Sequence, residues 1–405
     1  MIVPLREAVP DTCGGKAGAL GALLRAGLPV PDGFAVPFAA YLDAVRDLDL
    51  CTDAPDAVRQ AIEARPVHAT VLGALERALD ELGDPPVAVR SSAAGEDTGQ
   101  ASAAGQYESF LAVHGVGGVA EALRACWASL FTPHAIDYRS ASGGDDPVMA
   151  VIVQRHLDAE VSGVMFTPAD ADDATRIEAS WGLGPSVVGG TVTPDAYRVA
   201  ADGSVTRAVA LKRTRLDRDG GRLRTRDVPA DARHRPTIND ATATRLATLG
   251  GRIAAVLGGP QDVEWGIADG RTWILQARPV TAALPPPASP SAAPGTAAAE
   301  LTGTPGSHGS VTGIARIVRG PGDFARVQAG DILVCPFTDP AWTPLLRIAA
   351  GVITETGGVL SHAAIVAREL RIPAVLGIPG ATTTIADATT VAIDGTAGTV
   401  ATTTR

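Results

Sequence analysis

A histidine placed four residues after a pair of glycines is the most reactive arrangement in the sequence. His362 lies in GVITETGGVLSHAAIVARELRIPAVLGIPG, residues 351–380. The apolar run that opens this segment predicts a strand, and the spacing of apolar residues after the histidine predicts a helix. Gly357 and Gly358 predict a tight turn between the two. Ser361 can cap the helix, which places His362 in the first helical turn.

This position predicts a neutral, nucleophilic imidazole next to an anion-binding site. The positive end of a helix dipole disfavours imidazolium. Backbone N–H groups of the Gly-Gly turn and of the first helical turn can bind a phosphoryl group. A histidine that only caps or packs the helix is the alternative, and the strand–turn–helix context disfavours it. We therefore expect a phosphohistidine intermediate at His362, held in a nest formed by Thr356, Gly357, Gly358 and Ser361.

Four polar residues near position 270 form the best candidate metal site. Asp262 and Glu264 share one face of a predicted strand, and Gln276 and Arg278 share one face of the next, because residues two apart point the same way. Adjacent strands would bring carboxylate, amide oxygen and guanidinium to one point. Mg²⁺ prefers a few such oxygens together with ATP phosphates. A cross-strand ion pair is the alternative, above all for Asp262.

Two regions of the chain resemble the phosphoenolpyruvate-utilising enzymes, a family that includes pyruvate phosphate dikinase, phosphoenolpyruvate synthase and rifampicin phosphotransferase. The first carrier of the resemblance is the long motif TGGxxSHAAIVARExxIPAV around His362. The others follow in family order: 14–36, 87–97, 103–111, 126–139, 151–168, 181–197 and 261–281. The segment TDPAWTPLL, 338–346, is most similar to the synthase and rifampicin phosphotransferase branches.

The resemblance implies a role for each candidate residue. His362 would be the carrier histidine of a mobile, swivelling domain. Glu264 and Gln276 would hold Mg²⁺, and Arg278 would neutralise the phosphates. Lys16 and Arg90 would contact the phosphates of ATP, where a solvated lysine and a surface ion pair are the alternatives. The remaining expected positions are a phosphate loop containing Ser102 and Gly105, and an adenine-reading hinge from Gln154 to Leu157.

Composition limits the classes of protein that fit. The chain has 405 residues, of which 46% are hydrophobic and only 4% aromatic, so its cores must be aliphatic. A formal charge of −10 argues against a nucleic-acid or anionic-membrane partner. No secretory leader or membrane-spanning apolar run is evident, so we expect a cytoplasmic protein. The cysteines Cys13, Cys51, Cys126 and Cys335 form no CxxC pair, which disfavours zinc binding.

A change of composition divides the chain. Residues 282–300 are rich in Pro, Ala and Ser and read as a semi-rigid tether. The family resemblance implies that residues 1–281 form an ATP-grasp-like nucleotide-binding domain and that 301–405 form a small β/α/β phosphohistidine domain. The expected fold class is therefore mixed α/β and α+β.

The expected activity is an ATP-dependent phosphotransferase of the dikinase type. The resemblance to the synthase and rifampicin phosphotransferase branches implies that the β-phosphate of ATP passes to His362, with release of AMP and phosphate. The acceptor is expected to be a small molecule, such as a hydroxyl of a natural product or antibiotic. The alternative is a phosphocarrier module that passes phosphate to a separate protein or pyruvate-binding subunit. A degenerate binding protein is disfavoured by the complete set of candidate residues.

Overall fold

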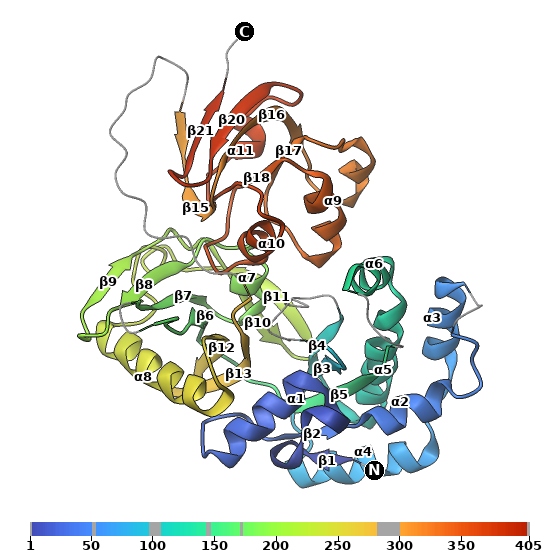
Figure 1. The fold of residues 1–405 in the computed structure, drawn as a ribbon. Coiled ribbons are helices and arrows are strands. Elements are labelled where there is room, and N and C mark those ends of the chain that lie inside the picture. The colour runs from blue at the N-terminus through green and yellow to red at the C-terminus, as the bar shows by residue number, and fades with distance from the viewer. Residues whose placement is uncertain are drawn as a thin grey trace.

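The computed structural model describes residues 2–50, 54–96, 107–142, 147–170, 173–281 and 300–402. They form a first lobe (2–155), a second lobe (156–281) and a C-terminal domain (300–402), each built on its own main sheet (Figure 1). The predicted phosphate-loop residues Ser102 and Gly105 lie outside the described residues. The same is true of 282–299 of the predicted tether.

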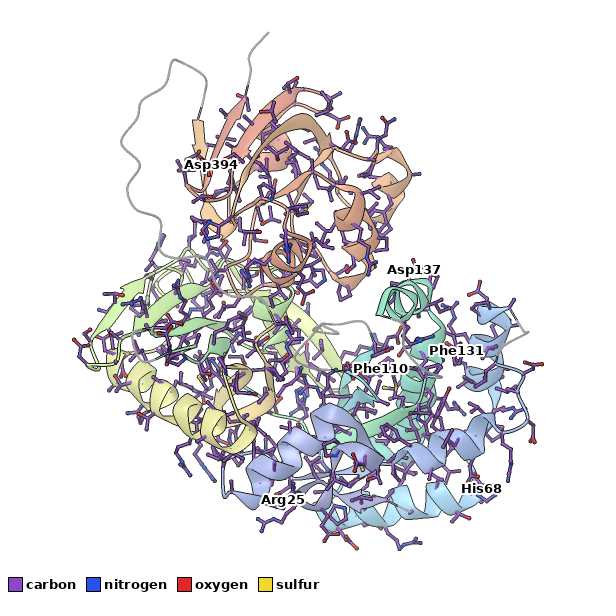
Figure 2. The ribbon with its side chains drawn as sticks, viewed as in Figure 1. Arg25, His68, Phe110, Phe131, Asp137 and Asp394 are labelled. Atoms are coloured by element: carbon purple, nitrogen blue, oxygen red, sulfur yellow. The ribbon has the colours of Figure 1, made fainter. Side chains whose placement is uncertain are left out.

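The first lobe is an antiparallel sheet covered by helices. Its strand order is β1 (Val3–Pro4), β2 (Gly33–Val36), β5 (Met149–Arg155), β3 (Val87–Ala93) and β4 (Ser109–Val113). Its helices are α1 (Pro10–Arg25), α2 (Phe38–Val45), α3 (Pro55–Ala64), α4 (Ala69–Leu82), α5 (Gly115–Ala128) and α6 (Pro133–Ser142). Side chains fill the space between sheet and helices, and buried Phe131 is part of that core (Figure 2).

Helix α1 contains a kink that only glycine permits. The helix begins at Pro10, earlier than the predicted Lys16, and is interrupted at Gly14, where φ is +79°. A Cβ at Gly14 would lie 2.3 Å from the carbonyl oxygen of Ser92. The close approach lets the hydroxyl of Ser92 accept the N–H of Ala17 at 3.1 Å. The kink therefore fixes the start of the regular helix, and with it Lys16, against the end of β3.

The second lobe is a six-stranded antiparallel sheet with one long helix on one face. The strand order is β13 (Arg271–Pro279), β12 (Gln261–Ala268), β6 (Val161–Phe166), β7 (Thr175–Trp181), β8 (Asp195–Val199) and β9 (Val205–Ala208). The other elements are α7 (Pro185–Val188), the hairpin β10 (Thr214–Asp219) and β11 (Arg222–Asp227), and α8 (Asp240–Leu257). Met165 packs in a core that also contains residues of α1 and α8. Its neighbours Val164 and Phe166 point to the opposite face.

The C-terminal domain mixes parallel and antiparallel strands. Its sheet order is β14 (Glu300–Thr302), β21 (Thr399–Thr402), β20 (Thr390–Asp394), β16 (Ser310–Ile317), β17 (Ile332–Cys335), β18 (Gly351–Thr354), β19 (Ala374–Leu376) and β15 (Thr304–Ser307). The helices are α9 (Thr343–Ile348), α10 (His362–Leu370) and α11 (Ala381–Thr384). Strands β16 to β19 run parallel, and α10 connects β18 to β19. Helix α10 lies at the end of the domain that faces the second lobe (Figure 1).

The mixed α/β fold class predicted from the sequence is confirmed. Short apolar and β-branched runs predict strands at 87–90, 148–154, 161–168 and 272–277 in the first two lobes, and β3, β5, β6 and β13 lie within a few residues of these ranges. In the C-terminal domain such runs predict strands at 313–319, 331–337, 351–355, 373–378 and 390–395, where β16 to β20 lie. The Arg- and Asp-rich stretch 216–237 predicts a loop or hairpin, and it overlaps the hairpin β10–β11. Several other elements, among them β7 to β9 and α8, are not predicted. In the described part of the chain, no helix is long and apolar enough to span a membrane.

A buried ion pair connects β8 to the chain that follows β9. Lys212 Nζ lies 2.5 Å from Asp195 Oδ1, and both side chains are fully buried. The same carboxylate accepts the N–H of Ala210 and both the N–H and the hydroxyl of Thr237. Asp195 had no predicted role, and its hydrogen bonds give it a structural one.

Replacement of Lys212 by Met should lower the free energy of unfolding by about 3–5 kcal/mol, because the Asp195 carboxylate stays buried without its cation. Urea denaturation followed by circular dichroism measures the change. Arg207→Met is the matched control: it breaks the exposed Arg207–Asp240 pair and should cost less than about 1 kcal/mol. Equal costs for the two variants would contradict the structural role of the buried pair.

Candidate functional site

One face of the second-lobe sheet carries the predicted metal-site residues in register. Glu264 on β12 lies opposite Gln276 on β13, and Asp262 lies opposite Arg278. Directly opposite residues in an antiparallel pair point to the same face. The four side chains therefore project from one face of the sheet, as the strand periodicity predicted.

Arg90, at the middle of β3 in the first lobe, reaches this face. Its Nη2 lies 3.1 Å from Glu264 Oε2 and 2.6 Å from Gln276 Oε1, and its Nη1 donates to the carbonyl of Leu275 at 2.6 Å. Two oxygens from neighbouring strands therefore converge on one cationic atom. The donor set suits Mg²⁺, which takes a few protein oxygens together with nucleotide phosphates. Within the described residues no cluster of three His, Cys, Asp or Glu side chains forms a metal site.

Asp262 and Arg278 form the cross-strand ion pair that was the alternative for Asp262. The Nε and Nη2 atoms of Arg278 both lie 2.8 Å from Asp262 Oδ2, and both side chains are buried. The pair lies two residues along each strand from Glu264 and Gln276. Arg278 is thus held beside the side-chain oxygens of Glu264 and Gln276, called the metal-type oxygens below. Its charge is balanced by Asp262.

A pocket of about 330 Å³ lies between the two lobes next to Glu264. Arg90, Gln154 and Leu157 contribute to its wall. The size is within the range of small-molecule sites, at ~300–1,000 Å³. Gln154 lies in the sheet opposite Gly33 and Ala88, and its side-chain amide donates to the carbonyl of Pro31.

The later part of the predicted hinge, which includes Leu157, therefore lies beyond the end of β5. The backbone of Gln154 lies between two neighbouring strands, β2 and β3. Leu157 follows the end of β5 and lines the pocket.

Lys16 is the other predicted phosphate ligand. Its side chain is buried, and its Nζ lies 2.5 Å from Glu96 Oε1.

His362 is the first residue of α10 and is buried between the C-terminal domain and the second lobe. Its Nδ1 lies 2.9 Å from the hydroxyl of Thr338, and its buried Nε2 has no hydrogen-bond partner among the residues that the structure describes. When Nδ1–H donates to Thr338, the lone pair is on Nε2. Nε2 is then the nucleophilic atom.

Burial lowers the pKa of His362 to about 4, and the positive charge of Arg278 contributes to this lowering. The imidazole is therefore neutral near pH 7, as the sequence predicted. The main cause is desolvation rather than the helix dipole. The influence of Arg278 also places the imidazole near the sheet face that holds Glu264 and Gln276.

The C-terminal domain docks on the second lobe through an apolar contact. Leu360 and Ile365 of the C-terminal domain share a buried cluster with Val164 and Phe166 of β6. Thr356 contributes a polar contact, because its hydroxyl donates to the carbonyl of Gly190 at 2.6 Å. Docking through these residues places the turn before His362 directly on the sheet.

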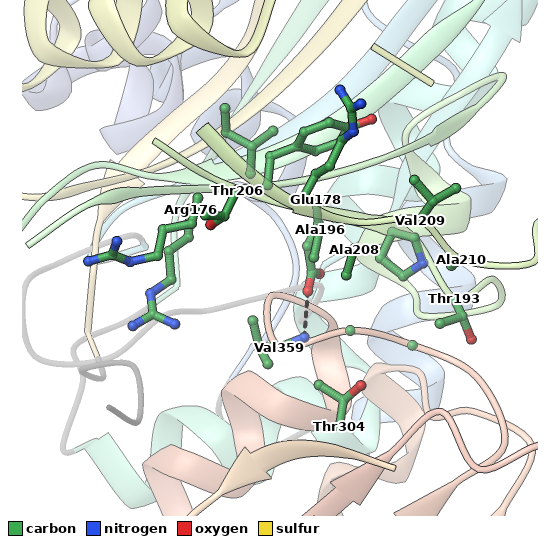
Figure 3. A pocket seen from close by; sticks show the side chains of 17 residues that line it. Arg176, Glu178, Thr193, Ala196, Thr206, Ala208, Val209, Ala210, Thr304 and Val359 are labelled. Atoms are coloured by element: carbon green, nitrogen blue, oxygen red, sulfur yellow. Dashed lines mark hydrogen bonds between the residues drawn. The ribbon is translucent and has the colours of Figure 1, made fainter. Parts of the chain in front are cut away.

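Glu178 of β7 makes the central polar contact of this interface. Its Oε1 accepts the N–H of Val359 at 2.7 Å, and its Oε2 accepts the N–H of Leu360 at 3.1 Å. Figure 3 shows the Glu178 side chain directed at the backbone of Val359. The carboxylate also lines a pocket of about 500 Å³, and Gly357 and Gly358 belong to the same lining.

Two sequence-based expectations about the nest need correction. Ser361 precedes the helix, but its hydroxyl donates to the carbonyl of Gly358 and makes no cap bond. Two N–H groups that follow the Gly-Gly turn bind Glu178 rather than being free for a phosphoryl group. The structure explains why both positions are glycine. Gly357 has a φ of +105°, and a Cβ at Gly358 would lie 2.3 Å from Glu178 Oε1.

Sequence reasoning missed two residues of the site. Thr338 was part of a quoted segment, but nothing in its spacing connects it to a histidine 24 positions later. Glu178 is the only charged residue in the otherwise apolar or small stretch IEASW, residues 177–181. A carboxylate flanked by buried positions was the available signal for a functional or partnered group.

Comparison with protein-family models gives two matches. Residues 10–293 match the pyruvate phosphate dikinase, AMP/ATP-binding domain. Residues 327–398 match the PEP-utilising enzyme, mobile domain.

Curated relatives agree with these matches. The probable phosphoenolpyruvate synthase of Methanothermobacter thermautotrophicus is 37% identical over 427 residues, which cover 96% of this chain and 61% of that protein. That of Archaeoglobus fulgidus is also 37% identical and covers 96% of this chain and 56% of that protein. The phosphoenolpyruvate synthase of Aeropyrum pernix is 32% identical, with the same coverage of 96% and 56%.

The chain thus spans about three-fifths of the length of these relatives. The matched regions include both the pocket between the lobes and the turn that carries His362. The chain belongs to the pyruvate phosphate dikinase and phosphoenolpyruvate synthase family of PEP-utilising enzymes.

Proposed function

We propose that this chain carries out the ATP half-reaction of a phosphoenolpyruvate synthase-type enzyme and forms a phosphohistidine at His362. The observation that carries the proposal is the buried, unpartnered Nε2 of a neutral His362, docked beside Arg278 on the sheet that holds Glu264 and Gln276. The family match to an AMP/ATP-binding domain supports ATP as the donor.

In the proposed reaction, Nε2 forms a bond to the β-phosphorus of ATP while the bond to the oxygen of AMP breaks. Water then takes the γ-phosphoryl group as inorganic phosphate, which leaves one phosphoryl group on the histidine. The Nδ1 proton stays in the hydrogen bond to Thr338. Catalysis of this kind rests on positioning and charge neutralisation. Lys16, Arg90 and Arg278 supply positive charge, and the pocket bounded by Gln154 and Leu157 would hold the nucleotide base.

Mg²⁺, when bound, would neutralise the phosphate charge. Glu264 and Gln276 would hold it, since their oxygens converge on one point, 3.1 Å and 2.6 Å from Arg90 Nη2. That geometry requires the guanidinium of Arg90 to move from the oxygens to the phosphates as the nucleotide enters.

The proposed acceptor of the phosphoryl group is pyruvate, held by a separate subunit or by sequence outside these 405 residues. The relatives named phosphoenolpyruvate synthase are longer than the matched region, and they favour this alternative. A natural-product hydroxyl, the leading sequence-based expectation, has less support.

Replacement of His362 by Ala should abolish labelling by ATP. Wild-type protein with Mg²⁺ and [β-³²P]ATP should form an acid-labile, base-stable phosphoprotein together with AMP, and the variant should form neither. EDTA should stop the wild-type reaction. Persistent label in the variant would refute the role of His362, and formation of ADP without AMP would refute transfer of the β-phosphoryl group.

Replacement of Thr338 by Val keeps the side-chain volume but removes the hydrogen bond to Nδ1. The rate of His362 phosphorylation should fall by about 10- to 100-fold, because the ring loses its orientation. Rapid-quench labelling measures the rate, and equilibrium binding of ATP should stay unchanged. Thr383→Val, at an exposed threonine of the same domain, is the control. An unchanged labelling rate in Thr338→Val would show that the hydroxyl has no orienting role.

Discharge of the purified ³²P-phosphoprotein identifies the acceptor. Pyruvate alone should leave the label in place, whereas pyruvate with a protein fraction from the source organism should convert the label to phosphoenolpyruvate. Pyruvate alone should fail because the two pockets described above, of about 330 and 500 Å³, are lined by the ATP-site and docking residues. Discharge by a small hydroxyl compound without added protein would instead support the natural-product acceptor.

A further inference from the structure

We infer that Glu178 is a positioning residue: its carboxylate holds the turn before His362 on the second-lobe sheet, in register with the Glu264–Gln276 site, for phosphoryl transfer. The inference rests on the proposed function and adds to it the group that determines where the imidazole stands. Glu178 acts through the backbone of the turn, since its hydrogen bonds go to two N–H groups and not to the imidazole.

The hydrogen bonds of Glu178 are directed at the other domain. In the part of the chain that the structure describes, both bonds that this carboxylate accepts come from Val359 and Leu360, which belong to the C-terminal domain. One oxygen binds each N–H, so the carboxylate fixes two successive peptide groups rather than one. This arrangement restrains both the position and the rotation of the turn.

A carboxylate is costly to keep at this place. Only 3% of the Glu178 surface is exposed. Burial raises the pKa of Glu178 to about 7, against the opposing effects of the two N–H donors and of Arg368. A buried charge that serves only its own sheet would be replaced at little loss by an apolar side chain. The hydrogen bonds that compensate for the burial of the Glu178 carboxylate come from the docked domain. This indicates that the carboxylate serves docking.

The register of the sheet connects Glu178 to the metal-type oxygens. Glu178 lies opposite Val164, and Val164 lies opposite Glu264, which in turn lies opposite Gln276. The docking carboxylate and the metal-type oxygens therefore occupy one row across four strands. Strands are spaced by about 4.8 Å, so Glu178 and Glu264 are separated by roughly 10 Å at the backbone. The sheet therefore fixes the distance between the metal-type oxygens and the turn.

The turn is shaped to receive the carboxylate. A Cβ at Gly358 would lie 2.3 Å from Oε1 and 2.4 Å from Oε2 of Glu178. The glycine therefore lets the carboxylate approach the backbone closely. Figure 3 shows the contact at the centre of the interface, between β7 and the turn.

The test compares Glu178→Gln with Glu369→Gln in the full chain. The Glu178→Gln change keeps the side-chain volume, but the new amide presents one acceptor and one donor to two N–H groups, so one bond is lost. Glu369 is a second interface glutamate, and one of its bonds is an exposed contact from Thr281. We expect Glu178→Gln to slow His362 phosphorylation by about 10-fold or more at saturating ATP, with unchanged ATP affinity. Glu369→Gln should change the rate by less than about twofold.

Hydrogen–deuterium exchange of the peptide that contains Val359 and Leu360 gives the second readout. These amides should exchange faster in Glu178→Gln than in the wild type, while β6 and β7 stay equally protected. A residue that only stabilised its sheet would instead loosen β6 and β7 and lower the thermal midpoint.

The outcomes separate the two claims. Normal labelling in Glu178→Gln, with wild-type labelling present, overturns the positioning role and leaves the proposed function intact. Unchanged exchange at 359–360 overturns the contact itself. Faster exchange in the variant, with no labelling even of the wild type, supports the contact and refutes the proposed function.

Discussion

The antiparallel register of the second-lobe sheet is the constraint on which the rest of the site depends. Because opposite residues share a face, the pairings of β13, β12, β6 and β7 determine which side chains meet. A shift of one residue on any of these strands would turn its functional side chains to the opposite face of the sheet, which packs against α1 and α8. The register therefore determines the positions of the metal-type oxygens, of the apolar docking patch and of the carboxylate that holds the turn.

Burial of the turn on this face explains the state of the histidine. The same contact that covers Leu360 and Ile365 removes His362 from water. Desolvation keeps the ring neutral, and the hydrogen bond between Nδ1 and the hydroxyl of Thr338 holds the ring in place. Under the proposed function, docking and activation of the nucleophile are thus one event. When the domain leaves the sheet, the ring is expected to regain an ordinary basicity together with its hydration.

The sequence predicted those features that depend on local pattern. The turn, helix α10 and the shared faces of β12 and β13 follow from glycine chemistry and from the periods of strand and helix. Contacts between distant segments could not be predicted in this way. Glu178 and Val359 are 181 residues apart, and only the docked arrangement brings them together. The prediction of a cap bond from Ser361 was wrong: its hydroxyl is turned toward the carbonyl of Gly358, to which it donates, and accepts no cap bond.

The guanidinium of Arg90, which lies between the oxygens of Glu264 and Gln276, has a consequence for the order of binding. A bare divalent cation that approaches these oxygens meets a fixed positive charge, and the repulsion opposes its entry. A metal–nucleotide complex brings phosphates that offer the guanidinium a new partner. Under the proposed function, Arg90 would therefore oppose the entry of free metal and favour simultaneous entry of metal and nucleotide.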